Sequence, residues 1–265
     1  MKIKLGIVGL GLIGASILKK LYNNEDYEIY CHSNSSYNEA KNYTPFASND
    51  IKIVQNCDIV FLCCELSKTL HYLDKLNTFL NQNTTVVDVA SVKENKYPKY
   101  NFNFILSHPM AGVENSGFSA GDENLFSNSK WLIEKENEIL NKVILDLEAK
   151  ILKVDMEKHN FLTAQISHLP AILSSVLFDC ATNEAKQIAS SGFRDTTRLA
   201  MTNSSLINSM FENNQENILK AFEMLIEKMN LLKNMNKDER INLFNEIASK
   251  RAKMYDNNGK NIFKI

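Results

Sequence analysis

The stretch Ile3-Lys4-Leu5-Gly6-Ile7-Val8-Gly9-Leu10-Gly11-Leu12-Ile13-Gly14 decides the fold of this 265-residue chain. It begins as an apolar β-strand, and the glycines at positions 9, 11 and 14 form the turn between that strand and a helix. Gly9 permits a tight turn, Gly11 lets the backbone approach a pyrophosphate, and Gly14 allows the helix to pack closely on the strand. The stretch therefore predicts a dinucleotide-binding turn.

The helix expected over residues 12–22 completes this site. The backbone N–H groups of Leu12 and Ile13 have no partner inside the helix and stand at its positive end, so they suit an anionic pyrophosphate. The glycine spacing alone is weak evidence for nucleotide binding, and a purely structural turn is the alternative. Its place between an apolar strand and an apolar helix favours nucleotide binding.

The position that reads the cofactor's ribose is less regular. An acidic residue is expected there, roughly 20 residues beyond the glycines, when the cofactor is NAD. Residues 29–36 read Ile-Tyr-Cys-His-Ser-Asn-Ser-Ser, with neither an acid nor an arginine. His32 and Ser33 are expected to contact the cofactor at this point. We predict NAD as the cofactor and leave NADP open.

The first 154 residues alternate between short β-rich runs and helical patterns. Apolar strands alternating with helices predict an α/β domain of the Rossmann type, with a doubly wound, mainly parallel sheet. Strands are expected at residues 3–8, 28–31, 58–64, 84–89, 103–106 and 131–134, and helices at residues 12–22, 66–79 and 138–150.

The pattern changes at residues 155–265, where glycine nearly disappears and apolar residues recur at steps of three and four. This periodicity predicts an all-helical second domain, which we expect to bind substrate and to form a dimer. Its broad apolar faces favour a homodimer over a helical layer packed only on the first domain. A cleft where two domains meet is the expected ligand site.

Composition argues against several classes of protein. A net charge of -1 argues against a nucleic-acid or membrane-surface partner. The five cysteines form no CxxC pair, so they are interpreted as small buried residues, and no metal site is predicted. No apolar stretch is expected to approach the ~20 residues that span a bilayer. We expect a reduced, cytoplasmic protein.

Four further segments narrow the prediction from dehydrogenases in general to one family. They are Asp-Val-Ala-Ser-Val-Lys at 88–93, Ser-His-Pro-Met-Ala-Gly at 107–112, Ile-Ser-His-Leu-Pro at 166–170 and Ser-Ser-Gly-Phe-Arg-Asp-Thr-Thr-Arg at 190–198. In this order after the glycine turn, they resemble the prephenate dehydrogenase family. The resemblance implies an NAD(P)-dependent oxidoreductase that decarboxylates prephenate to 4-hydroxyphenylpyruvate in tyrosine biosynthesis. An arogenate or dual-specificity cyclohexadienyl dehydrogenase is the alternative.

Ser91 and His108 are the candidate catalytic residues. Each ends or follows a predicted strand, so both are expected beyond the carboxyl ends of the sheet, where ligands bind. A histidine with a pKa near ~6.5 can be neutral at working pH and accept a proton. The resemblance implies that His108 takes the proton of the ring hydroxyl and that Ser91 holds the hydroxyl and the imidazole in line. His159 also matches a recurrent family position, but no chemistry follows for it.

Prephenate carries two carboxylates, so its site needs cations. By resemblance Arg198 binds a substrate carboxylate, for which a planar guanidinium is suited. The alternative for Arg198 is an ion pair with Asp195 on a helix surface. Lys93 is expected to attract the dianion or to contact the cofactor phosphates. Glu114 is expected to order the loop behind the catalytic histidine or to pair with a basic residue.

Pro170 lies inside a predicted helix, where it removes a backbone donor and should kink the helix. Ser167 is expected on the pocket side of this kink. By resemblance His168 borders the substrate there, and a structural role is the alternative for His168. Many prephenate-specific members of the family have histidine where this chain has Ala171. Because a methyl group cannot hydrogen-bond, the preference between prephenate and arogenate stays open.

Two other hypotheses compete with this one. The first is another short dehydrogenase with a helical second domain, acting on a hydroxy acid or an imino acid. The ordered set of Ser91, His108 and Arg198 argues against it. The second is a non-catalytic protein that senses NAD(H), which should lack a proton acceptor in its pocket. The context of His108 argues against this second hypothesis.

Overall fold

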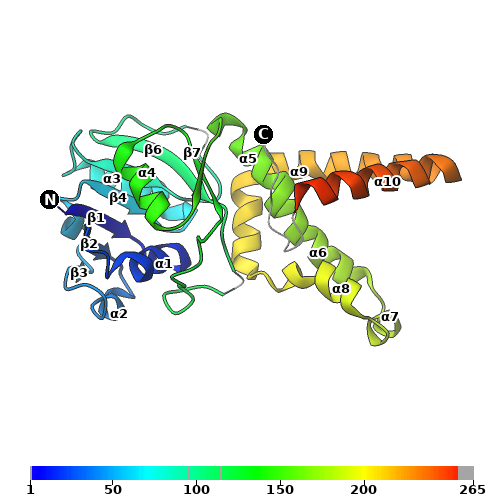
Figure 1. Ribbon diagram of the computed structural model, residues 1–265, viewed down its shortest axis with the longest axis horizontal. Helices are drawn as coiled ribbons and strands as arrows, with labels where there is room; N and C mark the ends of the chain where they lie inside the picture. Colours follow the sequence, from blue (N-terminus) through cyan, green and yellow to red (C-terminus); the bar gives the residue numbers. More distant parts are fainter. Residues whose placement is uncertain (1, 95, 114, 256–265) are drawn as a thin grey trace. The chain divides into compact units, whose positions relative to one another are not determined.

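The computed structural model describes residues 2–94, 96–113 and 115–255. An eight-stranded sheet, in the order β3-β2-β1-β4-β5-β6-β7-β8, organises its N-terminal part (Figure 1). Neighbouring strands from β3 to β6 are parallel, β7 is antiparallel to β6, and β8 is parallel to β7. The mainly parallel sheet is therefore confirmed. The strands are β1 (Ile3–Val8), β2 (Tyr27–His32), β3 (Ala47–Ser48), β4 (Ile59–Leu62), β5 (Thr85–Asp88), β6 (Asn103–Pro109), β7 (Lys130–Ile133) and β8 (Lys150–Lys153).

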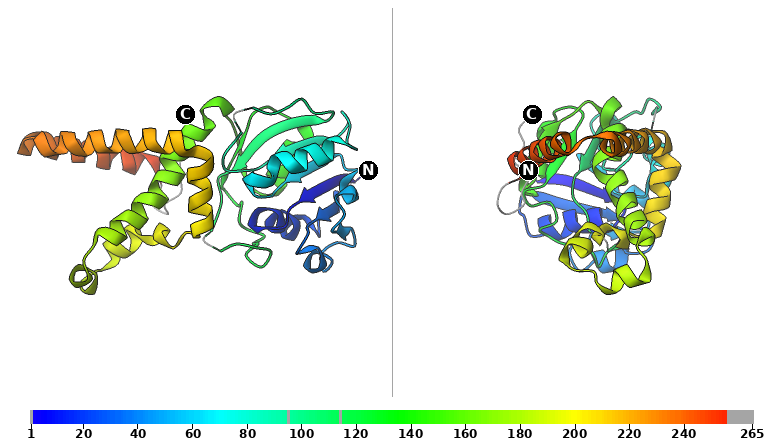
Figure 2. Two further views of the ribbon diagram at one scale, coloured as in Figure 1. Left: turned by 180° about the vertical axis from the view of Figure 1, so that it is seen from behind. Right: turned by 90° about the vertical axis from the view of Figure 1, so that its right-hand side faces the viewer.

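Helices cover both faces of this sheet, as the doubly wound prediction requires. Helices α1 (Leu12–Leu21) and α4 (Glu138–Asp146) share one hydrophobic core with Trp131, and Figure 1 shows them in front of the sheet. Helix α3 (Leu66–Asn77) belongs to the other core, and it lies in front when the molecule is seen from behind (Figure 2, left). The short helix α2 (Tyr37–Ala40) and the 3₁₀ turn η1 (Ile51–Val54) follow β2 and β3.

Strand β4 shows why the sequence folds in this way. All four of its residues are buried. Ile59 and Phe61 point into the core of α1 and α4, whereas Val60 and Leu62 point into the core of α3. A strand buried on both faces needs a continuous apolar run, because successive side chains alternate between the faces.

Two sequence-based expectations about local structure are wrong. The helix expected to run through residue 150 ends at Asp146, and the chain then forms β8. Glu148 has a left-handed φ of 60°, and the Ala149 N–H donates to the Ile144 carbonyl at 3.1 Å, which closes the helix. The two-residue strand β3 was not expected either. Both β3 and β8 are edge strands, whose pairing depends on partners far away in the sequence.

From Met156 onward, every element of two or more residues in the described chain is a helix. The chain divides into two compact units, residues 1–218 and 219–265, so the first of these helices share a unit with the sheet. The elements are α5 (Met156–Thr163), the π-helical turn η2 (Ala164–His168), α6 (Leu169–Cys180), α7 (Asn183–Gln187), α8 (Ser191–Thr196), the 3₁₀ turn η3 (Arg198–Met201), α9 (Ser204–Asn234) and α10 (Lys237–Met254).

The continuous helical run Met156–Cys180 corrects one expectation. It is long and apolar enough to cross a membrane, with a mean hydropathy of 1.5 over its most apolar window. About one third of that window is buried. One such helix is weak evidence for a membrane span, because long apolar helices of soluble proteins have the same length and composition. The run leaves apolar side chains exposed, including Leu162, Ile166 and Leu177.

Candidate active site

The glycine turn after β1 forms a cradle that fits a pyrophosphate. Gly9 has a left-handed φ of 96°, and a Cβ there would lie 2.6 Å from the carbonyl oxygen of Cys63. A Cβ on Gly14 would lie 2.0 Å from the carbonyl oxygen of Gly9, so glycine is needed for α1 to start this close to β1. By contrast, nothing lies within 4 Å of the Cβ position of Gly11. A ligand can therefore approach the backbone at Gly11.

The start of α1 supplies the donors for this cradle. Gly11 is the N-cap of the helix and makes no side-chain capping bond. The first N–H groups, including those of Leu12 and Ile13, thus stand at a positive helix end without a capping side chain. Together with the open space at Gly11, this arrangement fits a dinucleotide cofactor.

The carboxyl end of β2 holds His32 and Ser33, both buried. The His32 ring lies edge-on to Tyr72, with 5.7 Å between ring centroids, and its Nδ1 has no hydrogen-bond partner among the described residues. Burial, followed by the positive charge of Lys75, lowers the pKa of His32, so the ring is neutral. The Ser33 hydroxyl accepts the backbone N–H of Ser36 at 3.1 Å and thereby shapes the loop.

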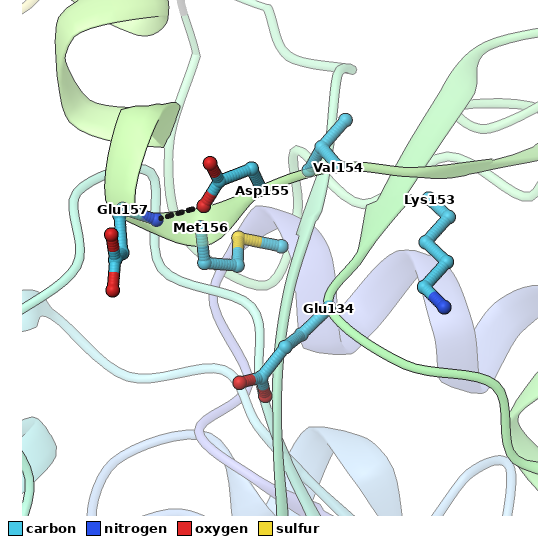
Figure 3. A pocket seen from close by; sticks show the side chains of 6 residues that line it. All are labelled: Glu134, Lys153, Val154, Asp155, Met156 and Glu157. Carbon is cyan, nitrogen blue, oxygen red and sulfur yellow. Dashed lines mark hydrogen bonds between the residues drawn. The ribbon is translucent and has the colours of Figure 1, made fainter.

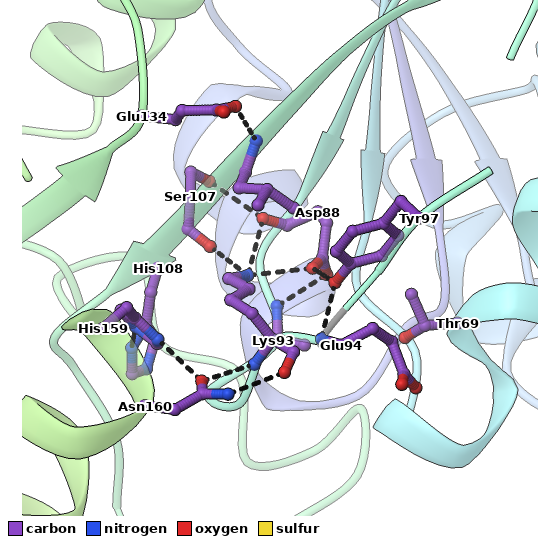
Figure 4. Close-up of polar contacts among 12 residues, drawn as sticks. Thr69, Asp88, Lys93, Glu94, Tyr97, Ser107, His108, Glu134, His159 and Asn160 are labelled. Carbon is purple, nitrogen blue, oxygen red and sulfur yellow. Dashed lines mark hydrogen bonds and ion pairs between the residues drawn. The ribbon is translucent and has the colours of Figure 1, made fainter. Parts of the chain in front are cut away.

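A buried ion pair ties the ends of β5 and β6 together (Figure 4). The Lys93 ammonium lies 2.9 Å from Asp88 Oδ2 and also donates to the carbonyl oxygens of Asp88, at 3.2 Å, and Ser107, at 2.6 Å. Both side chains are almost completely buried. Burial lowers the pKa of Lys93, and the Asp88 carboxylate opposes this shift. These three acceptors inside the protein match the three hydrogens of the ammonium, which leaves none for a cofactor phosphate or a substrate carboxylate.

Further hydrogen bonds surround the pair. Tyr97 donates its hydroxyl to Asp88 Oδ2 at 3.2 Å, and the Ser107 hydroxyl donates to the Asp88 carbonyl at 3.2 Å. Trp131 Nε1 donates in turn to the Ser107 hydroxyl at 3.2 Å. A buried charge is stable only when it is paired and hydrogen-bonded in this way. The network fixes the backbone on which the next residue, His108, is mounted.

His108 lies near the carboxyl end of β6 and is only 9% exposed. Its Nδ1 lies 3.0 Å from His159 Nε2, and the two rings meet edge-on with centroids 5.1 Å apart. Burial lowers the pKa of His108 well below its usual value, and the positive charge of Lys93 acts in the same direction. The imidazole is therefore neutral at neutral pH, as a proton acceptor must be.

Helix α5 brings His159 and Asn160 against this network. Asn160 makes two hydrogen bonds with the backbone of Lys93: its Oδ1 accepts the Lys93 N–H at 2.8 Å, and its Nδ2 donates to the Lys93 carbonyl at 2.7 Å. His159 Nδ1 lies 3.2 Å from the same Oδ1. Burial lowers the pKa of His159 to about 4. The side chain of Asp155 caps the start of the helix.

Sequence reasoning missed two members of this arrangement. Asn160 had no distinguishing pattern, because asparagine is common throughout the chain. Asp88 was quoted only as the start of a segment. An acid at a strand end, followed five residues later by Lys93, was the one signal that pointed to the pair.

The irregularity expected before Pro170 is the π-helical turn η2. Because proline has no N–H, the carbonyl one turn earlier loses its donor in a regular α-helix. A π-helical turn changes the hydrogen-bond spacing at this point and so accommodates the proline. His168, the last residue of this turn, is fully buried, and its Nδ1 lies 3.2 Å from Asn214 Nδ2. Its Nε2 has no partner among the described residues. Asn214 also donates to the Asn160 carbonyl at 2.8 Å from a non-helical point of α9.

The other predicted residues are placed as follows. Ser91 is half-buried in the loop after β5, and Ser167 is half-buried in η2. Arg198 begins the 3₁₀ turn η3 and is exposed. The Asp195 carboxylate, expected as its alternative partner, lies 2.8 Å from Arg194 Nε. Glu114 lies outside the described residues.

A shallow pocket opens where β7 and β8 end and α5 begins (Figure 3). Its walls carry the carboxylates of Glu134, Asp155 and Glu157 and one ammonium, that of Lys153. Three carboxylates against one cation repel a substrate with two carboxylates. We therefore do not assign the substrate to this pocket.

Two family models match the chain. The first, "Prephenate dehydrogenase, nucleotide-binding domain", matches residues 15–153, and the second, "Prephenate dehydrogenase, dimerization domain", matches residues 155–249. The chain belongs to the prephenate dehydrogenase family. It is an NAD-dependent oxidoreductase, and the family places it in the synthesis of tyrosine. Its second segment belongs to a family of dimerization domains.

Curated relatives and solved structures agree with this assignment. A prephenate dehydrogenase of Lactococcus lactis is 32% identical over 240 residues, which cover 83% of this chain and 67% of that protein. One from Bacillus subtilis is 26% identical over 272 residues, covering 92% and 73%. A Synechocystis arogenate dehydrogenase structure is 28% identical, with a TM-score of 0.76 and coverage of 94% and 97%.

A more distant structure shows the same fold. The prephenate dehydrogenase of A. aeolicus, in complex with hydroxyphenyl propionate and NAD+, has a TM-score of 0.80 at 24% identity and covers 95% of this chain and 98% of its own. At that identity the likeness is one of fold. It confirms that the Rossmann-type sheet and the helical segment after it occur together in this family.

Proposed function

We propose that this chain is a prephenate dehydrogenase in which His108 accepts the substrate proton. The observation that carries the proposal is a buried, neutral imidazole near the carboxyl end of β6. Since β1, β4, β5 and β6 are parallel neighbours, that end lies at the same edge of the sheet as the glycine turn after β1. Ligands of open α/β sheets bind at this edge.

Catalysis in this proposal needs one proton acceptor. NAD, when bound, supplies the oxidant that accepts a hydride from the ring carbon bearing the hydroxyl. His108 takes the hydroxyl proton, and Ser91 hydrogen-bonds to hold the hydroxyl in line with the imidazole. The ring carboxylate leaves as carbon dioxide, and the electron pair of the broken bond makes the ring an aromatic phenolate. The phenolate then takes the proton back from His108, which gives the phenol. Because aromatisation favours the reaction, the protein's contribution is orientation and proton acceptance.

Substrate binding is assigned to residues of the helical segment and one loop. We propose that Arg198 holds a carboxylate of the substrate through its planar guanidinium. Ser167 and His168 border the substrate at the π-helical turn, where His168 Nε2 has no partner among the described residues. For Glu114, which lies outside the described residues, the two sequence-based alternatives stand: it orders the loop behind His108, or it pairs with a basic residue.

Cofactor binding is assigned to the turn after β1 and the end of β2. Gly9, Gly11 and Gly14 shape the pyrophosphate site, and the N–H groups of Leu12 and Ile13 supply its donors. His32 and Ser33 lie at the ribose end. We no longer assign Lys93 to the cofactor phosphates or to the substrate, because its ammonium is buried among Asp88 and Ser107.

We further propose a nucleotide-binding domain at residues 1–154 and a substrate-binding, dimerising domain at residues 155–265. The two family models meet between residues 153 and 155, which supports this boundary. The homodimer forms through the helical segment, whose exposed apolar side chains include Ile166, Val176 and Leu177. The relatives are biosynthetic enzymes with small-molecule substrates, which favours the cytoplasm.

Arogenate is the second candidate substrate. Ala171, which follows Pro170 in α6, is buried and presents only a methyl group where many prephenate-specific relatives have histidine. A cyclohexadienyl dehydrogenase of Zymomonas mobilis, 24% identical over 255 residues, also matches the chain, covering 86% of it and 87% of that protein. The two substrates differ only by an amino group in place of a keto group.

A steady-state comparison of both substrates with both cofactors tests the proposal. We expect NADH to form with prephenate. The ratio of kcat/KM for arogenate to kcat/KM for prephenate gives the substrate preference that Ala171 leaves open. A wild-type protein that binds NAD but oxidises neither substrate would overturn the proposal in favour of a nucleotide sensor. Turnover of a hydroxy acid or an imino acid alone would favour another class of dehydrogenase.

A further inference from the structure

The hydrogen bonds around Asn160 determine which way its side-chain amide points. The Lys93 backbone offers one N–H, which can only donate, and one carbonyl, which can only accept. The Lys93 N–H lies 2.8 Å from Asn160 Oδ1, and the Lys93 carbonyl lies 2.7 Å from Asn160 Nδ2. Turning the amide over would place two donors face to face and two acceptors face to face. The position of Oδ1 is therefore fixed by the backbone.

This oxygen determines the protonation of the neighbouring ring. Asn160 Oδ1 can only accept, and His159 Nδ1 lies 3.2 Å from it, so Nδ1 of His159 carries a hydrogen. Burial lowers the pKa of His159 to about 4, so at neutral pH the ring carries one hydrogen. Its Nε2 is then a lone-pair acceptor.

The same reasoning applies to the next ring. His108 Nδ1 lies 3.0 Å from His159 Nε2, and a hydrogen bond between them needs one donor. Because His159 Nε2 is the acceptor, His108 Nδ1 carries the hydrogen. Since the ring of His108 is also neutral, its Nε2 is left with a lone pair. Among the described residues, this contact with His159 is the only hydrogen bond of the His108 ring.

We infer that His159 and Asn160 are positioning residues that hold His108 in the Nδ1–H tautomer, with Nε2 as the atom that takes the substrate proton. The inference rests on the proposed function for the role of His108 as proton acceptor, but the tautomer itself follows from the contacts. In the opposite tautomer Nε2 would carry a hydrogen and could not accept another. An aspartate performs the corresponding task in serine proteases; here a neutral Asn–His pair orients the ring without adding a charge.

Nitrogen NMR of the wild-type protein tests the tautomer without any substrate. Long-range proton–nitrogen correlation spectra of protein labelled with ¹⁵N-histidine at neutral pH distinguish a protonated from an unprotonated ring nitrogen. The His108→Gln and His159→Gln variants assign the two rings by the loss of their signals. We expect Nδ1–H with bare Nε2 in both rings. A hydrogen on His108 Nε2 in the wild-type protein would overturn the inference.

Variants of His159 test the consequence for turnover. His159→Leu removes the acceptor for His108 Nδ1–H, so we expect kcat to fall on the order of 10- to 100-fold while KM changes about twofold or less, because a positioned base contributes roughly 10²–10⁴ in rate. His159→Gln offers an amide oxygen as acceptor and should recover part of the loss. His71→Gln, on the exposed surface of α3, is the control and should match wild type.

The proposed function of the chain and the positioning role of His159 can fail separately. If wild type oxidises neither prephenate nor arogenate, the proposed function fails, and the NMR spectra still report the tautomer. If wild type is active and His159→Leu, folded and with normal NAD binding, keeps the wild-type kcat, the positioning role is wrong. Should His159→Leu not fold, the wild-type spectra decide the tautomer alone.

Discussion

At the scale of single residues, the buried histidines, His32 among them, make the stability of the protein depend on pH. Burial lowers the pKa of His168 to about 4, and His159 is shifted to about 4 and His108 well below its usual value for the same reason. In the unfolded chain these groups titrate near ~6.5. Folding therefore favours their neutral forms, and the stabilisation is complete above that pH and is lost as pH falls toward about 4.

We accordingly predict that the free energy of unfolding falls between pH 6.5 and pH 5, a window set by those pKa values. Urea titrations of the wild-type protein at several pH values in that range measure the slope of the free energy of unfolding against pH. His168→Gln should flatten it, whereas His71→Gln, at an exposed position, should leave it unchanged. A midpoint that stays constant down to pH 5 would show that these rings are not buried as neutral groups.

A second prediction concerns Arg198, which we propose binds a carboxylate of the substrate. Arg198→Gln should raise KM for prephenate by roughly 10- to 100-fold with a smaller change in kcat, because it removes binding that ground state and transition state share. Steady-state kinetics at saturating NAD measure both parameters. Arg194→Gln, an exposed arginine paired with Asp195, is the matched control. A fall in kcat with unchanged KM would instead assign Arg198 to the chemical step.

At the scale of elements, the Asp88–Lys93 pair holds β5, β6 and α5 in one arrangement. We predict that Lys93→Met lowers the free energy of unfolding by about 3–5 kcal/mol, since it leaves a buried carboxylate without its cation. Adding Asp88→Leu to Lys93→Met removes the uncompensated carboxylate and should recover part of the lost free energy of unfolding. Guanidinium unfolding measures both variants. Lys142→Met, which removes the pairs with Asp26 and Asp146, should lower the free energy of unfolding far less, because water screens these charges.

The elements also show how far the sequence alone could lead. The glycine turn, strand β4 and helices α1 and α3 were predictable, because local periodicity and turn chemistry decide them. The place of His108 at a strand end followed from the same patterns. Strand β8 and the side-chain pair of Asn160 with the Lys93 backbone did not, because their partners lie far away in the sequence and no local propensity reports them.

At the scale of the whole molecule, the exposed apolar face of residues 156–180 predicts the assembly. We expect a molar mass of about twice the 30.2 kDa of one chain by light scattering. Leu177→Glu, at an exposed apolar position of α6, should shift the protein toward monomer upon dilution. Leu145→Glu, at a more exposed apolar position of α4, should not. Dissociation by the α4 variant and not by the α6 variant would move the interface to the nucleotide-binding domain.

In the proposed mechanism one neutral imidazole, that of His108, accepts the proton while NAD is reduced. The most direct measurement is the turnover of His108→Asn with prephenate and saturating NAD, alongside its affinity for NADH. We predict that kcat falls by roughly 10²–10⁴ while KM and NADH affinity stay near wild type, because a base is lost and binding is not. A His108→Asn protein that binds NADH normally and turns over at the wild-type rate would contradict the claim.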